Sequence, residues 1–168
     1  MNGLNFDIVR EVIRILNPYG KIFISSEIEL DSEFKQLRLM TNPTQIHHVL
    51  YFANLLISDS QSMPGEAAIL GTPSIRVSDF AGRISVLGEL EHSYQLTFGI
   101  NPSHPGNLYK KIEELLNTPN LNEKWQKRRQ KMLADKIDVT AFMVWLIENY
   151  PKSAEIMRKD PEYQLRFK

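Results

Sequence analysis

Short runs of apolar and β-branched residues alternate along this chain with segments whose apolar residues recur at helical spacing, and this alternation constrains the fold most strongly. Strands that alternate with helices favour a parallel sheet with helices packed on both of its faces. We therefore predict a doubly wound α/β fold, in which three of the runs are neighbouring or near-neighbouring inner strands. Those three runs are Lys21–Ser25, Leu55–Ser58 and Pro73–Val77. Further strands are predicted at Gln95–Phe98 and, from a weaker pattern, at Leu37–Met40.

The predicted helices cover Asn5–Asn17, a segment that follows Thr44, Met63–Leu70, Arg83–Glu91, Leu108–Leu116, Glu123–Leu133 and Val139–Tyr150. Thr44 is expected to cap the second helix with its hydroxyl, and Gly71 to end the third in a left-handed conformation. The chain opens on a helix, whereas a doubly wound domain opens on a strand. We therefore expect a half-domain over residues 1–134 whose first strand is missing. Residues 135–168 are expected to form a helical tail that packs back on this domain or on a partner.

Composition excludes several classes of function. The chain has 168 residues, which fits one domain, and it contains no cysteine, so a disulfide framework, a thiolate zinc site and a cysteine nucleophile are ruled out. Twenty basic residues balance twenty acidic ones, which argues against a nucleic-acid partner. A basic run at 124–131 is interpreted as a solvated helix face. Because we find neither a signal peptide nor a transmembrane stretch, a cytoplasmic location is expected.

The turn after the second of the three inner strands is the best candidate for a binding site. In open parallel sheets, ligands bind beyond the carboxyl ends of the strands, beside the amino termini of the following helices. Leu55–Ser58 delivers a polar turn to such a place: Asp59, Ser60, Gln61 and Ser62. The hydroxyls of Ser60 and Ser62 can donate to a phosphate, and Glu66, about one turn into the next helix, can accept from a pair of sugar hydroxyls.

A purely structural interpretation fits the same residues equally well. Asp59 or Ser62 can cap the helix, and Glu66 can lie in its first turn because the helix dipole favours an anion there. Since Gly65 is the only glycine in the turn, the spacing does not specify a dinucleotide.

Several segments together resemble one known family. They are LISDSQS with EAAILGTPSIR (residues 56–76), KIFISSE (21–27), IHHVLYFANL (46–55), DFAGRIS (79–85) and DKIDVTAFMVWLIENYP (135–151). In these motifs the chain is similar to a microbial domain family of unknown function. That family is distantly similar to UDP-N-acetylglucosamine 2-epimerases and to glycosyltransferases of the two-domain GT-B fold.

The resemblance implies a fold and a set of roles. The fold is the Rossmann-like carboxyl-terminal domain of a GT-B protein, which holds a UDP-sugar or another nucleotide-sugar in the cleft between its domains. The turn at 60–62 would contact phosphate and Glu66 the ribose, with Arg76 near the same cleft. Asp79 and Arg83 belong to a loop that would close over the ligand. Ion pairs at the sheet edge or on the solvent side remain an equally good interpretation of both arginines.

The resemblance also implies that half of the active site is absent from these residues. Relatives carry an amino-terminal domain that supplies most acid and base residues, so no catalytic residue is assigned and the isolated chain is expected to be inactive. An amino-terminal half on another chain, or a homo-oligomer that covers the exposed seam, is the expected partner. The leading hypothesis is thus a sugar-nucleotide-binding domain in surface polysaccharide or glycolipid synthesis. The alternatives are a non-catalytic nucleotide-binding or protein-interaction module and, last, a receiver-like domain.

Histidine placement gives no case for a metal site. His47 and His48 are adjacent, whereas helical metal pairs sit four residues apart, and neither His92 nor His104 has carboxylates at ligand spacing. No metal and no cofactor are therefore expected. Trp125 and Trp145 are interpreted as core or interface anchors.

Overall fold

The computed structural model describes residues 3–27 and 29–168. Its elements in chain order are α1 (Phe6–Leu16), η1 (Ser32–Leu37), η2 (Pro43–Gln45), α2 (Ile46–Phe52), β1 (Leu56–Ser58), α3 (Met63–Leu70), β2 (Ser74–Val77), α4 (Ser85–His92), β3 (Thr97–Ile100), α5 (Pro105–Leu116), α6 (Leu121–Asp135), α7 (Val139–Glu148), α8 (Lys152–Lys159) and η3 (Pro161–Phe167). The α denotes an α-helix and η a 3₁₀ helix. The predicted helices are thus all present, with ends that differ by a few residues.

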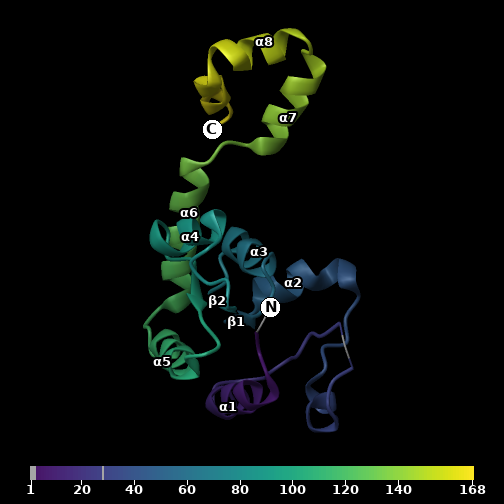
Figure 1. The fold of residues 1–168 in the computed structure, drawn as a ribbon, viewed down its shortest axis with the longest axis vertical. Helices are drawn as coiled ribbons and strands as arrows, with labels where there is room; N and C mark the ends of the chain where they lie inside the picture. The colour runs from purple at the N-terminus through teal and green to yellow at the C-terminus, as the bar shows by residue number, and fades with distance from the viewer. Residues whose placement is uncertain (1–2, 28) are drawn as a thin grey trace.

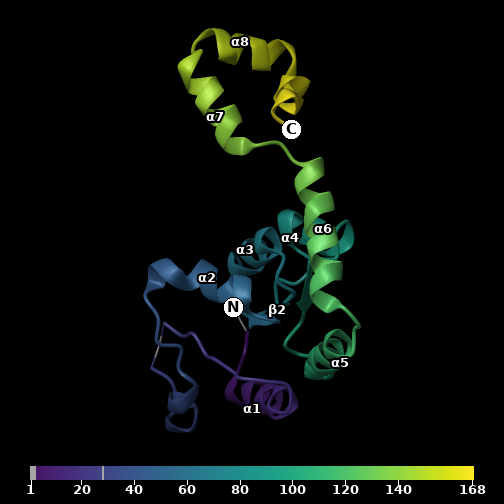
Figure 2. The same cartoon turned by 180° about the vertical axis from the view of Figure 1, so that it is seen from behind.

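A three-stranded parallel sheet in the order β1-β2-β3 lies at the centre of the part of the protein from α1 to α6, which we call the body. Helices α1 and α5 lie on one side of it, and α2, α3 and α4 on the other, as Figures 1 and 2 show from opposite directions. Every residue of the central strand β2 is buried, whereas the residues of β1 are only partly buried. The predicted α/β class with a parallel, two-sided sheet is therefore confirmed.

The helices are held on the sheet by apolar stripes. In α1 the buried residues are Ile8, Val12 and Ile15, which recur at helical spacing and pack into one core cluster with α5 and β2. The side chain of Asn5 starts this helix by accepting from the Ile8 amide at 2.9 Å. Trp125 of α6 joins the same core, is 2% exposed, and donates its indole N–H to the Leu96 carbonyl at 3.0 Å.

The prediction of an inner strand at Lys21–Ser25 is wrong. This segment is extended but lies outside the three-stranded sheet, and only Ile24 pairs, through a parallel bridge to Arg38. The weaker candidate Leu37–Met40 is reduced to the other half of that bridge, because Leu37 ends the 3₁₀ helix η1. A strand needs a partner along its length, and the apolar pattern of residues 21–25 does not supply one.

The predicted cap at Thr44 is also wrong. The N-cap position of α2 is Gln45, which makes no side-chain capping bond, and Asn42 caps the preceding turn: its side-chain oxygen accepts from the Thr44 amide at 3.0 Å and from the Thr44 hydroxyl at 2.9 Å. The chain then makes the 3₁₀ turn η2 before α2 begins. At the end of α3, by contrast, Gly71 has the expected left-handed conformation, with φ of 79°.

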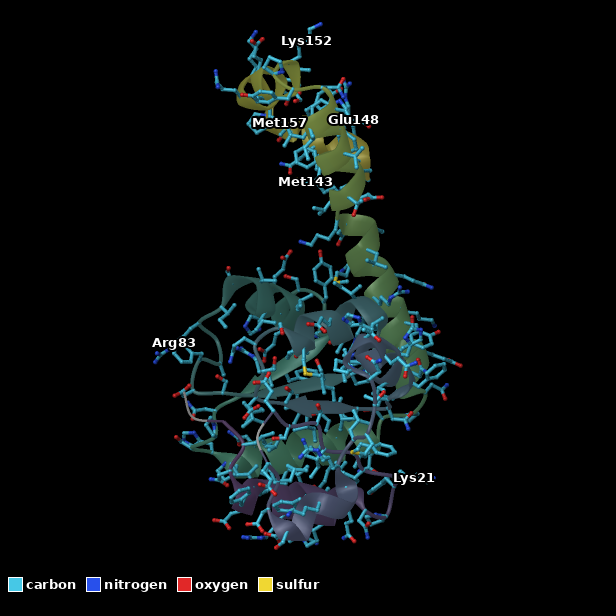
Figure 3. All side chains as sticks on the ribbon, turned by 90° about the vertical axis from the view of Figure 1, so that its right-hand side faces the viewer. Lys21, Arg83, Met143, Glu148, Lys152 and Met157 are labelled. Carbon is cyan, nitrogen blue, oxygen red and sulfur yellow. The ribbon has the colours of Figure 1, made fainter. Side chains whose placement is uncertain are left out.

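The carboxyl-terminal tail stands apart from the body. Figures 1 and 2 show α7, α8 and η3 beyond the far end of α6, and Met143 and Met157 lie in this separate part in Figure 3. The tail has an aromatic cluster of its own, in which Trp145 stacks on Tyr163 with 4.8 Å between ring centroids. Docking of this tail on a partner stays a prediction. None of the described helices is long and apolar enough to cross a membrane.

Candidate functional site

The turn that joins β1 to α3 is organised by Ser60. Its hydroxyl oxygen accepts from the amides of Ser62 and Met63, both at 3.3 Å, and its own amide donates to the Ser58 hydroxyl at 3.0 Å. The side chain of Ser62 makes no capping hydrogen bond to α3 and lies 3.4 Å from that of Ser60, hydroxyl to hydroxyl. The side-chain acceptor at the start of this helix is therefore Ser60, which lies two residues before the N-cap position Ser62, and not Asp59 or Ser62.

Gln61 ties the turn to the neighbouring strand. Its side-chain oxygen accepts from Nη1 of Arg76 in β2 at 2.7 Å, and its side-chain nitrogen donates to the Ser78 hydroxyl at 3.1 Å. The same Ser78 oxygen accepts from the Phe80 amide at 3.1 Å, which fixes the first residues of the loop after β2. One glutamine thus couples the loops at the carboxyl ends of both strands.

Arg76 lies in the interior of the protein beneath this turn. It is only 1% exposed and belongs to the central strand, so the interpretation of Arg76 as a sheet-edge or solvent-side ion pair is wrong. Burial lowers the pKa of Arg76, and the charge of Glu91 in α4 opposes that shift. Its Nε has no hydrogen-bond partner among the described residues.

Gly99 of β3 provides the space that the Arg76 guanidinium occupies. A Cβ at Gly99 would lie 3.2 Å from Nη2 of Arg76 and 3.1 Å from a carboxylate oxygen of Glu91. Both contacts are tighter than ordinary van der Waals contacts, so a larger residue at this position would displace one of the two side chains. The sequence analysis identified neither Gly99 nor Glu91 as part of this site.

Glu66 projects from the first turn of α3 toward α2. One of its carboxylate oxygens lies 3.1 Å from Nε2 of His47, and the side chains of the pair are 35% and 60% exposed respectively. A pair with this exposure is open to solvent and can exchange partners. His47 is therefore a neighbour of the site that sequence spacing did not reveal, because it lies 19 residues away on another helix.

The remaining candidate residues lie at the margin of the turn. Arg83 is exposed, lies over the Phe80 ring at 5.9 Å from its centroid, and projects away from the body in Figure 3. Asp79 is half-buried at the start of the same loop. Asp59 is exposed and lies against Gly3, where an added Cβ would come within 2.5 Å of the Asp59 Cβ. The structure therefore brings Ser60, Gln61, Ser62 and Arg76 together and leaves Arg83 outside.

The chemistry available at the turn is hydrogen-bond donation near the positive end of a helix. The amides of Gly65 and Glu66 donate to the Ser62 carbonyl at 2.9 and 3.2 Å, so the hydroxyls of Ser60 and Ser62 are the donors that can reorient toward a ligand. No atom would lie within 4 Å of a Cβ at Gly65, so a ligand can approach the backbone there. An anionic group suits this position, since α3 presents the positive end of its dipole.

The turn also adjoins a large groove. This groove has a volume of 910 Å³ and runs between residues 19–25, α1, α2 and β1, and its lining includes Ser58, Asp59 and Met63.

Among the described residues, no group of three or more histidine, aspartate and glutamate side chains is arranged to hold a metal ion. No protein-family model matches this chain, and a search of curated protein sequences finds no match.

Proposed function

We propose that this chain is the carboxyl-terminal, sugar-nucleotide-binding domain of a GT-B-like glycosyltransferase or epimerase relative that acts in surface polysaccharide or glycolipid synthesis. The observation that carries the proposal is the build of the turn at 59–62. Two serine hydroxyls stand at the start of α3, and the turn is anchored from beneath by the buried guanidinium of Arg76 through Gln61.

In this proposal the phosphates of the nucleotide bind to the hydroxyls of Ser60 and Ser62. The partial positive charge at the amino end of α3 favours an anion there. The charge of Arg76 adds to this attraction because it lies one hydrogen bond below the turn, in an interior where charges are screened less than in water. Arg76 thus acts as a positioning residue that keeps Gln61 and the turn in place.

Glu66 is proposed to accept hydrogen bonds from the two ribose hydroxyls. A carboxylate has two acceptor oxygens, which match a pair of neighbouring hydroxyl groups. The exposed contact with His47 uses one of these oxygens, and ribose binding would share or replace it. Loss of so exposed a contact costs about 1 kcal/mol or less, which ribose hydrogen bonds can offset.

Catalysis by the isolated chain is not part of the proposal. In the relatives that the chain resembles, the other domain supplies the general acid and base. Purified protein is therefore expected to show no turnover of UDP-N-acetylglucosamine or related donors. Epimerase or transferase activity from the 168-residue protein would contradict the expectation that the other domain is needed for catalysis.

Calorimetric titration of UDP, and of pyrophosphate in parallel, tests the binding site. Ser62→Ala is expected to weaken both ligands about tenfold, since it removes a phosphate donor. Glu66→Ala is expected to weaken UDP by a similar factor and to leave pyrophosphate unchanged, because pyrophosphate has no ribose. Ser103→Ala, an exposed serine on a different loop, is the matched control. Equal heats of binding from the wild type and the three variants would contradict the binding site and leave the turn with a structural role alone.

A protein-interaction module is the second candidate, and the tail favours it. Helix α7 leaves large apolar side chains exposed, among them Val139 at 61% and Ile147 at 69%. Apolar residues gathered on one helix that stands away from the body are typical of a surface that another protein covers. In this case the 168-residue protein would bind a partner and show no response to UDP.

A further inference from the structure

The groove beside β1 has four walls, and their chemistry indicates what it can hold. It has a volume of 910 Å³ and lies between two extended segments, residues 21–25 on one side and Leu55–Asp59 on the other. Side chains of α1 and α2 form the other two walls, and Leu115 and Leu116 of α5 and Leu121 of α6 also line the groove. Helices α1 and α2 lie on opposite faces of the sheet (Figure 1), so the groove continues the plane of the sheet beyond β1.

The β1 wall presents an open backbone edge. The Leu56 amide donates to the Pro73 carbonyl at 2.9 Å, which shows that Leu56 points its backbone groups toward β2. In a parallel ladder alternate residues bond to the same neighbour, so Ser58 also points toward β2 and Ile57 points the other way. The N–H and C=O of Ile57 therefore face the groove.

The opposite wall presents a second open edge. The Ile24 amide donates to the Leu37 carbonyl at 2.8 Å, and the Ile24 carbonyl accepts from the Leu39 amide at 2.9 Å. Both backbone groups of Ile24 thus point away from the groove, and by the same alternation those of Phe23 and Ser25 point into it. The groove is therefore bordered on two sides by backbone donors and acceptors that face it.

The two helical walls are apolar apart from His48 of α2. Val9, Ile13 and Leu16 line the groove from α1, and Ile46 and Val49 line it from α2. Each of these side chains is only partly buried, as is Ile57 in β1. A segment in this position would therefore bury apolar side chains on both of its faces, which is the environment of an inner strand in a parallel sheet.

We propose that this groove receives an extended, apolar strand of another polypeptide, which completes the sheet by pairing with β1 and with residues 21–25. Such strand addition gains affinity from main-chain hydrogen bonds and selectivity from the side-chain pockets. The inference does not depend on the proposed nucleotide site, because the groove would accept a strand whether or not the turn at 59–62 binds phosphate.

The position of α1 sets the direction of the strand. In parallel α/β folds a helix begins beside the carboxyl end of a strand. Helix α1 begins at Phe6, a few residues after Gly3, and Gly3 lies against Asp59 at the carboxyl end of β1. A strand with its carboxyl end at this point runs parallel to β1.

A second copy of the chain is a poorer occupant than a different polypeptide. The described apolar runs with strand character are already placed, three of them in the sheet and residues 21–25 in the wall of the groove itself. A second copy would have to give up one of its own strands to fill the groove. A different polypeptide with a free apolar strand has no such cost.

A synthetic peptide tests this inference on the 168-residue protein. The peptide carries a central run of about five valine and isoleucine residues, the length of the groove walls, flanked by lysines for solubility. Binding measured by fluorescence anisotropy is expected, with slower amide hydrogen exchange at Ile57, Phe23 and Ser25. A control peptide that is N-methylated at alternate residues of the run keeps the apolar side chains and loses half of the donors. It is expected to bind at least about tenfold more weakly.

A groove variant provides the second measurement. Ile13→Lys places a charge in the α1 wall and is expected to weaken the peptide at least about tenfold, while Val86→Lys, at an exposed position of α4, leaves binding unchanged. Circular dichroism checks that both variants are folded. Equal affinity for the unmodified and the N-methylated peptide would show that binding depends on apolar contact alone and not on strand pairing, and would overturn the inference. Failure of the valine and isoleucine peptide to bind would also overturn it. So would slower hydrogen exchange of the Ile57 amide at higher protein concentration without peptide, because a second copy of the chain would then fill the groove.

Discussion

Arg76 on the central strand and Gln61 in the turn after β1 are joined by a hydrogen bond of 2.7 Å, and this contact connects the interior of the sheet to the candidate site. Arg76 is 1% exposed, so its charge is held inside the protein, where it is stabilised by this hydrogen bond and by the nearby charge of Glu91. Gln61 also donates to Ser78. The conformation of the turn therefore depends on a side chain that a ligand would not touch.

Replacing Gln61 with leucine tests this dependence. Gln61→Leu removes the acceptor of Nη1 of Arg76 and one of the two donors to the Ser78 hydroxyl, and a buried donor that loses its acceptor costs about 1–3 kcal/mol. Urea denaturation should show a fall of that size in the free energy of unfolding. Gln130→Leu, on an exposed face of α6, is the control. The same stability for both variants would mean that the contact contributes nothing to the fold.

The pair formed by His47 and Glu66 is expected to contribute little to stability. The His47 and Glu66 side chains are 60% and 35% exposed, and a surface pair of this kind contributes about 0–1 kcal/mol. His47→Ala should therefore change the free energy of unfolding by less than about 1 kcal/mol, as should His48→Ala at its exposed neighbour. A loss for His47→Ala as large as that for Gln61→Leu would make the pair a structural element, and would argue against a free role for Glu66 in ligand binding.

Tyr94 gives the fold a defined response to alkaline pH. Burial raises the pKa of Tyr94, and its hydrogen bond to the Asp135 carboxylate raises it further. Because the folded state holds this proton more tightly than the unfolded state, the stabilisation is fully present below about pH 10 and is lost as pH rises through the folded pKa. The difference in melting temperature between the wild type and Tyr94→Phe should therefore shrink above about pH 10.

Tyr19→Phe is the control for that measurement, because Tyr19 is 57% exposed. A change in melting temperature with pH that both variants share is not assigned to Tyr94. A constant difference for Tyr94→Phe would contradict the raised pKa.

The tail is expected to unfold without the body. Trp145 holds its aromatic cluster together, with centroid distances of 4.8 Å to Tyr163 and 5.4 Å to Phe167. Trp145→Ala should remove amide protection in α7 and α8, because it deletes the ring that contacts Phe142, Tyr163 and Phe167. Hydrogen exchange should leave the amides of β2 unchanged. Loss of protection in β2 would show that the tail stabilises the body, which its separate position in Figure 2 does not suggest.

Local patterns predicted the elements that local contacts form. Helix α3 has the predicted ends, Met63–Leu70, because a left-handed glycine at 71 stops it. Strand β3 begins at Thr97, two residues later than predicted, since Gln95 has a positive φ of 54° and the Leu96 amide closes the preceding turn on Leu90. These are differences of boundary and not of type.

Contacts between distant residues decided what the sequence could not show. The apolar pattern at 21–25 predicted an inner strand, but an inner strand pairs with a neighbour on each side, and the pairing found for this segment is one isolated bridge at Ile24. The turn at 59–62 was found from its position after a strand, whereas the roles of Ser60 and Gln61 depend on tertiary geometry. Arginine is usually exposed, so nothing in the pattern of β2 indicated that Arg76 is buried.

Mapping UDP binding by amide chemical shifts in solution tests the central claim most directly. Nucleotide phosphates on the turn at 59–62 should move the amide signals of Ser60, Ser62 and Gly65 most, with a smaller change at Glu66 and little change along α6. The shifts should saturate with one binding constant and should be strongly reduced in Ser62→Ala. Saturable shifts confined to another surface, or no shifts at all at millimolar UDP, would contradict the account.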